Sequence, residues 1–221
     1  ANPLCGRIAE RVTDLGGTAV LTEVPEMFGA EGFLMNRCVN EAVFEKAVDM
    51  INGFKNYFIS HNEVVYDNPS PGNRQGGITT LEDKSCGCVQ KGGTAPIMDV
   101  IGYGDPVTAK GLNMLYGPGN DLVSATAMTA AGAHMILFTT GRGTPFGAPA
   151  PTLKLATNSQ LAEKKKGWID FDAGPIADGE SIDDAAKRLL QLVIETADGK
   201  QTKAEEKGFR EISIFKDGVV L

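Results

Sequence analysis

Residues 112–131 read LNMLYGPGNDLVSATAMTAA, and the pattern of this segment predicts the fold class. Leu112–Tyr116 is apolar and strand-like, residues 117–121 form a Gly- and Pro-containing turn, and an Ala-rich helix follows. The order recurs twice: residues 135–145 are a strand and a Gly-rich turn, and residues 152–166 are a strand, a turn and a helix. Strands that alternate with helices predict an α/β fold, with a mainly parallel sheet covered by helices on both faces as a three-layer sandwich.

The first hundred residues follow the same plan. Residues 4–15 have helical spacing and stop at two glycines, and residues 18–22 read as a buried strand. A second helix begins after Asn40, a good N-cap, and a short strand is expected at 97–101. The predicted core stripe of that second helix consists of Phe44, Val48, Ile51, Phe54 and Phe58.

Three further elements complete the prediction. A helix is expected from Thr79 or Thr80 towards Gln90, and another opens at Ser181, which forms a capping box with Asp184. Residues 211–215 alternate like a terminal strand, possibly an edge strand. We find no internal repeat or linker, so residues 1–221 are interpreted as one domain.

Composition narrows the function classes. The net charge is −7 and the sequence pI is about 4.9, which argues against a nucleic-acid partner. The lysines at 164–166 are interpreted as a solvated helix end. No apolar run approaches the roughly 20 residues that span a bilayer, so no membrane segment is expected. Four cysteines without a dense framework favour reduced thiols and a cytoplasmic location.

Polar residues follow several of the predicted strands. Ligands of open parallel sheets bind outside the carboxyl ends of the strands, so these residues are expected to converge if the strands are parallel neighbours. The residues that this rule brings to one edge are Glu23, Glu26, Asn120, Asp121, Arg142, Thr144 and Asn158. The turn before Asp121 either binds an anion at a helix start or is a plain capped turn, and Asp121 is also a candidate metal ligand.

The loop at residues 139–146 is the strongest candidate for an anion site. Two glycines flank Arg142, which can donate a bidentate fork to a carboxylate, and Thr140 and Thr144 add hydroxyl donors. The alternative is a tight turn whose arginine bridges neighbouring loops. The loop lacks the P-loop ending and the dinucleotide-binding spacing.

A third cluster lies in residues 71–84. Asn73 is a candidate hydrogen-bonding residue, and Glu82 and Asp83 cannot both face the same side of a helix. Lys84 could act as a base if burial lowered its pKa, whereas a surface ion pair is the plainer interpretation.

The sequence resembles the altronate branch of the galactarate/altronate dehydratase family over nearly its whole length. The segments that carry this resemblance are residues 21–30, 68–73, 76–84, 118–121, 140–145 and 168–174. The resemblance implies a metal-dependent hydro-lyase that converts D-altronate to 2-dehydro-3-deoxy-D-gluconate in hexuronate catabolism. It also implies a divalent metal, iron(II) or manganese(II).

Complete members of the family carry an N-terminal β-rich domain and a middle region with several cysteines. The resemblance therefore implies that residues 1–221 are the C-terminal α/β domain of a sugar-acid dehydratase, cut within the catalytic region. Most metal ligands would then lie upstream, those within this chain stay unknown, and the chain alone would be inactive.

The reaction assigns roles to the candidates already named. Dehydration builds charge on a carboxylate, which needs a cationic or metal clamp. Arg142 is the expected substrate anchor, assisted by Thr140 and Thr144, and the residues suited to polyol hydroxyls are Asn73, Asn120 and Asp121. The proton-transfer candidates are Glu23, Glu26, Glu82 and Lys84, which the sequence does not rank.

The expected partners are a small sugar acid and the upstream domains of the same protein, and self-association into a homo-oligomer stays open. One alternative is a related lyase, either a galactarate dehydratase or an enzyme like sulfolactate sulfo-lyase. A second is a non-catalytic module that binds sugar acids, and a third is a scaffold domain.

Overall fold

The computed structural model describes residues 1–66 and 68–218. In these residues two three-stranded sheets form, and every strand pair in them is parallel, which confirms the predicted α/β class. The first sheet has the order β1-β3-β2, with β1 Thr18–Leu21, β2 Ile97–Ile101 and β3 Gly111–Leu115. The second has the order β4-β5-β6, with β4 Ile136–Thr140, β5 Thr152–Ala156 and β6 Phe171–Asp172. The sequence predicted one sheet, whereas no described strand joins β1 to β4.

Several helices begin where the sequence predicts. The side chains of Asn40, Thr80 and Ser181 each accept a hydrogen bond from a first-turn backbone N–H. The α-helices are α1 Asn2–Asp14, α2 Gly32–Met35, α3 Glu41–Ser60, α4 Pro71–Gln75, α5 Leu81–Val89, α6 Asp121–Ala130, α7 Ser159–Lys164, α8 Ile182–Ala197 and α9 Lys203–Glu206. Three 3-10 turns complete the list, η1 Val24–Met27, η2 Gln90–Gly92 and η3 Gly174–Ile176.

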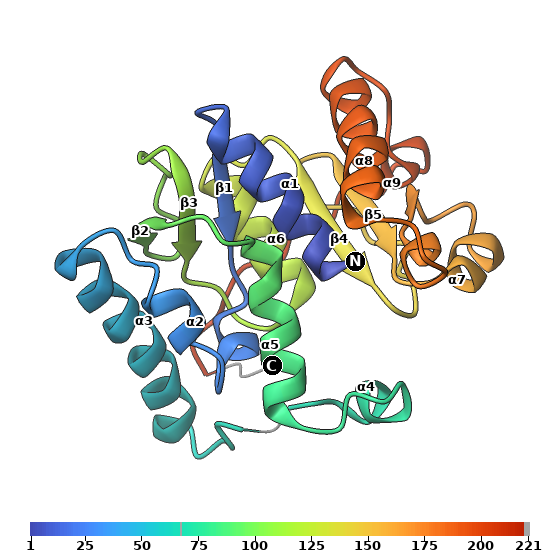
Figure 1. Ribbon diagram of the computed structural model, residues 1–221. Coiled ribbons are helices and arrows are strands. Elements are labelled where there is room, and N and C mark those ends of the chain that lie inside the picture. Colours follow the sequence, from blue (N-terminus) through green and yellow to red (C-terminus); the bar gives the residue numbers. More distant parts are fainter. Residues whose placement is uncertain (67, 219–221) are drawn as a thin grey trace.

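Helices cover both faces of the sheets, as the three-layer prediction requires. On one face, Leu4 and Ile8 of α1 share a buried cluster with Leu153 and with Leu189 of α8. On the other face, α6 packs against strands of both sheets. Figure 1 shows α1 in front of the strands and α6, drawn fainter, behind them. These two helices therefore hold the two sheets side by side.

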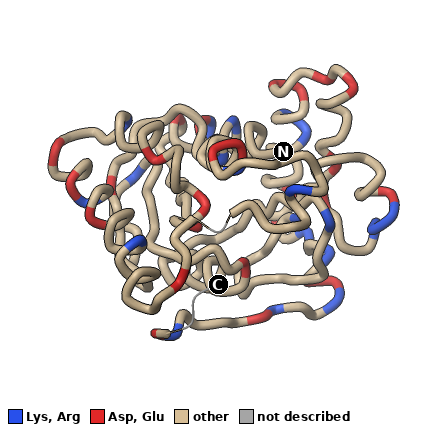
Figure 2. The backbone as a smooth tube through the Cα atoms, turned by 90° about the horizontal axis from the view of Figure 1, so that it is seen from below, with Lys and Arg blue, Asp and Glu red and all other residues tan. Residues whose placement is uncertain are grey.

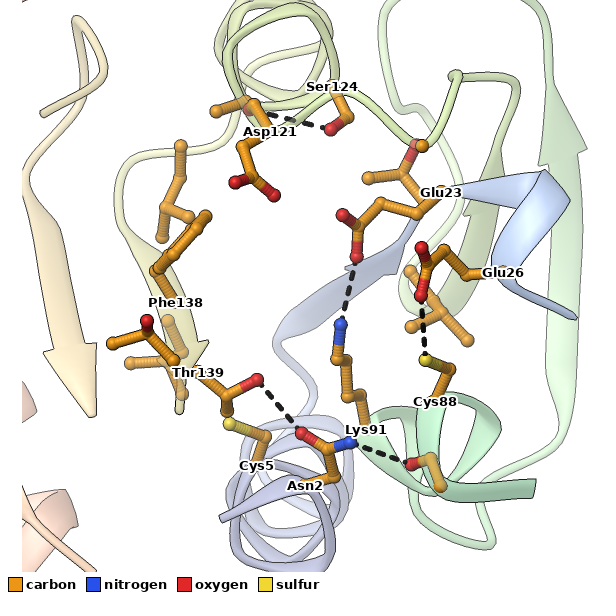
Figure 3. Close-up of a pocket in the computed structure, with 18 of the residues that line it drawn as sticks. Asn2, Cys5, Glu23, Glu26, Cys88, Lys91, Asp121, Ser124, Phe138 and Thr139 are labelled. Carbon is orange, nitrogen blue, oxygen red and sulfur yellow. Dashed lines mark hydrogen bonds and ion pairs between the residues drawn. The ribbon is translucent and has the colours of Figure 1, made fainter. Parts of the chain in front are cut away.

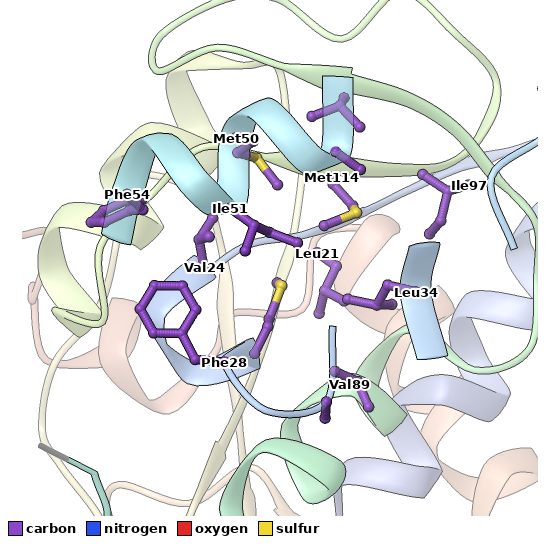
Figure 4. Close-up of a cluster of buried hydrophobic side chains, with 14 of the residues drawn as sticks. Leu21, Val24, Phe28, Leu34, Met50, Ile51, Phe54, Val89, Ile97 and Met114 are labelled. Atoms are coloured by element: carbon purple, nitrogen blue, oxygen red, sulfur yellow. The ribbon is translucent and has the colours of Figure 1, made fainter. Parts of the chain in front are cut away.

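The largest core lies between the first sheet and α3 (Figure 4). Phe54 stacks on Tyr116 with ring centroids 4.5 Å apart. The predicted stripe of α3 is only partly right, because Phe44 is 40% exposed whereas Val43 and Ala47 are buried. The helix is rotated about its axis so that the small side chain of Ala47 packs against the core. Hydrophobic spacing alone does not predict this rotation.

The expected strand at residues 211–215 does not form. The Glu211 N–H donates to the Gly147 carbonyl at 2.8 Å, but the next two donors bind side chains: Ser213 N–H donates to Thr126 Oγ1 at 3.1 Å and Phe215 N–H to the Tyr103 hydroxyl at 2.8 Å. Ile212 and Ile214 stay mostly exposed, so the alternation does not mark one buried sheet face.

The surface carries charges of both signs. Lysines and arginines are scattered among aspartates and glutamates rather than gathered on one face (Figure 2). Over residues 1–66 and 68–218, no helix combines the length and the apolar character needed to cross a bilayer.

Candidate functional site

A large cleft of about 1890 Å³ lies between the two sheets. Every residue of β1 and of β4 lines it, together with residues of α1, α5 and α6. Its polar end lies at the carboxyl end of β1, where Figure 3 shows Glu23, Lys91 and Asp121 around an open space. This is where the strand-end rule for parallel sheets places a ligand site.

Glu23 lies two residues after the end of β1 and adopts a backbone conformation that is rare for a side-chain-bearing residue. Its φ of 67° and ψ of 56° lie in the left-handed region, which costs roughly 1–2 kcal/mol for an L-residue. The next residue, Val24, donates its N–H to the carbonyl of Gly117 at 2.9 Å, so the chain is fixed at this turn. The strained conformation turns the Glu23 carboxylate towards Lys91 (Figure 3).

Lys91 lies in η2, directly after α5, and points into the polar end of the cleft. Its ammonium donates to Glu23 Oε2 at 2.9 Å. Burial works to lower the pKa of Lys91, but the attraction of Glu23 and Glu26 outweighs it and raises the pKa above its ordinary value. Lys91 is therefore a permanent positive charge facing the cleft.

A second ion pair lies beside the first. The Lys84 ammonium is 2.7 Å from Glu26 Oε1 and also donates to Asn68 Oδ1 at 3.0 Å. The Cys88 thiol donates to Glu26 Oε2 at 3.2 Å, and burial raises the pKa of this thiol to about 12. Cys88 is thus a neutral donor that holds Glu26. Lys84 forms an ion pair, as its plainer interpretation expected, but the pair is not on the surface, since the Lys84 side chain is only 14% exposed.

Asp121 is the first residue of α6 and faces the open cleft. Its partial desolvation, and then repulsion from Glu23, raise its pKa to about 6. Asp121 is therefore mostly ionised at neutral pH and takes up a proton as the pH falls through about 6. Asp121 has a pKa close to neutral pH, and the Lys91 ammonium lies in the same cleft. Two such groups can together catalyse a proton transfer.

The predicted anion loop lines the same cleft, opposite α4. The Arg142 guanidinium lies against the backbone of Gly72, where an added Cβ would be 2.6 Å from its Cζ, and Nη2 donates to Gln75 Oε1 at 3.3 Å. Thr140 Oγ1 accepts from the N–H of Gly143 at 2.9 Å. The Arg142 side chain itself stays exposed, so its fork can reach a ligand.

The structure brings together most of the predicted residues. Those that line the cleft are Glu23, Glu26, Asn73, Lys84, Asp121, Thr140, Arg142 and Thr144. Glu82 is exposed and does not line it, while the Asn120 side chain caps α6 by accepting from the Val123 N–H at 3.2 Å.

Sequence reasoning missed Lys91 and Asn2. Asn2 accepts from Thr139 Oγ1 at 2.9 Å and donates to the Gly87 carbonyl at 3.0 Å, so it links β4 to α5. Lys91 stands before two glycines and resembles an ordinary basic helix end, which gives no signal of its role. Asn2 lies next to Pro3, a pattern typical of any helix start.

In the part of the chain that the structure describes, no three His, Cys, Asp or Glu side chains gather as they would around a metal ion. Glu23 and Glu26 are each already paired with a lysine. The described residues therefore do not by themselves fit an iron(II) or manganese(II) centre.

A parallel α/β domain with a charged ligand cleft at its strand ends is the class of protein that this fold and site define. The chain belongs to the D-galactarate/altronate dehydratase family, because residues 1–220 match the sequence model of the C-terminal part of that family.

Individual relatives agree with this assignment. The chain is 56% identical to the altronate dehydratase of Escherichia coli (strain K12) over 221 residues and 54% identical to that of Bacillus subtilis (strain 168) over 222 residues. It is 33% identical to the galactarate dehydratase (L-threo-forming) of Escherichia coli (strain K12) over 224 residues. Each comparison covers 100% of this chain but only 45%, 45% and 43% of those proteins. The chain thus spans less than half the length of these relatives.

Proposed function

We propose that this chain forms part of a hydro-lyase that dehydrates a sugar acid, with D-altronate as substrate and 2-dehydro-3-deoxy-D-gluconate as product in hexuronate catabolism. The observation that carries the proposal is the joint placement of Lys91, Glu23 and Asp121 at one polar end of the cleft. The high identity to two altronate dehydratases supports altronate over other sugar acids.

The reaction removes a proton from the carbon next to the substrate carboxylate and expels the hydroxyl of the following carbon as water. Asp121 is our candidate for the base, because a pKa of about 6 leaves it largely ionised yet still basic at neutral pH. Lys91 then stabilises the negative charge that develops on the substrate carboxylate as the proton leaves. Glu23 acts on this step indirectly by fixing the Lys91 ammonium.

The leaving hydroxyl needs a proton of its own. Glu26 and Lys84 form a hydrogen-bonded pair in the same cleft and are our candidates for delivering it. Arg142, with Thr140 and Thr144, is proposed to bind the far oxygens of the substrate, and Asn73 and Asp121 to bind its hydroxyls. We no longer give Glu82 or Asn120 a direct role, since neither lines the cleft.

For the complete protein we propose a divalent metal, iron(II) or manganese(II), held mainly by residues outside this chain. The greater length of the relatives leaves room for those ligands. Such an ion would supply Lewis-acid stabilisation of the substrate carboxylate. We further propose a cytoplasmic enzyme, supported by four unpaired cysteines, with the rest of its own polypeptide as its main partner.

The test is substrate profiling of the full-length gene product purified with iron(II) or manganese(II). We expect turnover of D-altronate to exceed that of galactarate and of sulfolactate. A clear preference for galactarate would move the assignment to the galactarate dehydratases, which the 33% identity keeps as the second candidate. Binding of sugar acids without any turnover would favour a non-catalytic binding module.

A further inference from the structure

The cleft has a second, apolar part that the proposed chemistry does not use. β1 is the outer strand of the first sheet and β4 is the outer strand of the second, and both line the cleft along their whole length. We call the space between these two strands, closed by α1 on one face and α6 on the other, the slot. Figure 3 shows the open space between the strand that carries Phe138 and the strand that leads to Glu23.

The backbone of both outer strands has unused hydrogen-bonding groups. In the first sheet the Gly17 carbonyl accepts from the Gly111 N–H, and in the second the Ile136 N–H donates to the Pro151 carbonyl. Successive residues of a strand direct these groups to opposite sides. Val20 of β1 and Leu137 of β4 therefore present their N–H and C=O groups to the slot. A row of such unpaired groups is a template for another strand.

Both outer strands also run in the same direction. The carboxyl end of β4 lies beside the N-terminal end of α1, where the Thr139 hydroxyl donates to the Asn2 side chain at 2.9 Å. β1 begins directly after α1, through the turn at Gly16 and Gly17, and so runs antiparallel to that helix. A single strand placed in the slot could therefore pair in parallel with both of its neighbours.

The slot walls are apolar away from the charged end. α1 contributes Ile8 and Val12, four residues apart, and α6 contributes Ala125 and Met128, three residues apart, so each pair lies on one face of its helix. The side chains of these four residues offer no hydrogen bond to a sugar acid, which has a hydroxyl on nearly every carbon. They suit the alternating apolar side chains of a strand buried on both faces.

The topology indicates where that strand comes from. α1 packs over β1 and leads directly into it, as the crossover helix of a β-α-β unit does, but no strand precedes it among residues 1–66 and 68–218. In such units the first strand lies in the same sheet as the second, reached by a right-handed crossover. The relatives are more than twice as long as this chain, so a preceding segment has ample length.

We propose that a β-strand from the part of the full-length protein that precedes residue 1 occupies the slot and pairs with β1 and β4. It joins the two three-stranded sheets into one parallel sheet of seven strands, with the order β2-β3-β1-x-β4-β5-β6. The inserted strand ends beside Asn2, next to Lys91, so the loop that follows it completes the wall of the charged site (Figure 3).

Photo-crosslinking in the full-length gene product tests this proposal. The photoreactive residue p-benzoylphenylalanine replaces Phe138, which faces the cleft, and in a matched control it replaces Phe33 of α2, which is 64% exposed and lies outside the cleft. We expect the probe at 138, and not the one at 33, to join a peptide that precedes residue 1. A crosslink to residues 1–221 of a second copy, or no crosslink to a preceding peptide, overturns the proposal.

Hydrogen exchange of the unmodified full-length protein gives a second readout that depends neither on the probe nor on turnover. We expect the amides of Val20 and Leu137 to exchange at least about 100-fold more slowly than free amides, as amides in a central strand do. Ala19 and Phe138, whose amides point towards β3 and β5, serve as internal references. Fast exchange at Val20 and Leu137 with slow exchange at the references overturns the proposal.

Discussion

The Glu23 carboxylate lies 2.9 Å from the Lys91 ammonium, although the two residues are 68 positions apart in the sequence. The pair joins the end of β1 to the end of α5, and each of its side chains is about one-fifth exposed. Its position in the cleft makes Lys91 a fixed positive charge that can face a bound carboxylate.

Replacing Lys91 by methionine in the full-length protein should lower kcat/KM by about 100-fold or more, as the loss of one preorganised electrostatic donor does. It also leaves Glu23 without its partner, so the melting temperature should fall. The matched control is Lys46→Met, which removes an ion pair of 2.8 Å to Asp99 on the surface, with Lys46 56% exposed. Equal activity in the two variants would remove Lys91 from the site.

The backbone of Glu23 gives a prediction about stability. Glu23→Ala and Glu23→Gly both remove the carboxylate, but only glycine is free of strain at a φ of 67°. The glycine variant should therefore be more stable than the alanine variant by about 1 kcal/mol, while both lose activity to a similar extent. Urea unfolding and steady-state kinetics measure the two effects, and an alanine variant as stable as the glycine variant would show that the turn relaxes.

Whether a contact in this site could be predicted from the sequence depends on how far apart its two residues lie along the chain. The caps at Asn40 and Ser181 were predicted, and the start of α5 was placed at Thr79 or Thr80, because such signals involve residues only a few positions apart. The rule for strand ends gathered Glu23, Glu26 and Asp121 correctly, since it needs only the strand boundaries. The pairing of Glu23 with Lys91 and of Glu26 with Lys84 was not predicted, because these contacts depend on how segments distant in the sequence pack.

The fold, too, could be predicted where local patterns determine it and not where distant partners do. Of the six strands in residues 1–66 and 68–218, five could be predicted from apolar runs, whereas β6, with two residues, is too short for such a signal. The segment 211–215 has the alternation of a strand, yet the N–H groups of Ser213 and Phe215 bind the side chains of Thr126 and Tyr103 and not a neighbouring strand. Alternation shows that a segment can be extended and does not show that a neighbouring strand is present.

The raised pKa of Asp121 predicts the pH dependence of activity. If Asp121 is the base, kcat/KM should rise tenfold per pH unit below about pH 6 and level off above it. Asp121→Asn should lower kcat/KM by about 100-fold or more and abolish this acid limb. An unchanged limb in the asparagine variant would assign the titration to another group.

Stability should show the opposite trend with pH. The pKa of Asp121 is 3.8 in its ordinary state and about 6 in the folded chain, so between these values the folded state binds more protons than the unfolded state. The contribution of Asp121 to the free energy of unfolding is therefore largest below pH 4 and is lost as the pH rises through 6. Relative to wild type, Asp121→Asn should thus gain stability as the pH rises from 4 to 7, as measured by urea unfolding at both values. A constant difference between the two proteins would contradict the shift.

Arg142 and Gly72 give the last prediction, because the guanidinium of one rests on the backbone of the other. Arg142→Lys should lower kcat/KM at least about tenfold, since an ammonium cannot reproduce a planar fork. Gly72→Ala should reproduce part of this loss, because its Cβ would lie 2.6 Å from the guanidinium carbon and push it aside.

The matched control is Arg74→Lys on α4, the helix of Gly72; Arg74 is exposed and does not line the cleft. A rise in KM alone would mean that Arg142 binds substrate and transition state equally, and a fall in kcat would mean that its contact strengthens during the reaction. Wild-type kinetics in both Arg142→Lys and Gly72→Ala would show that the loop is a structural turn.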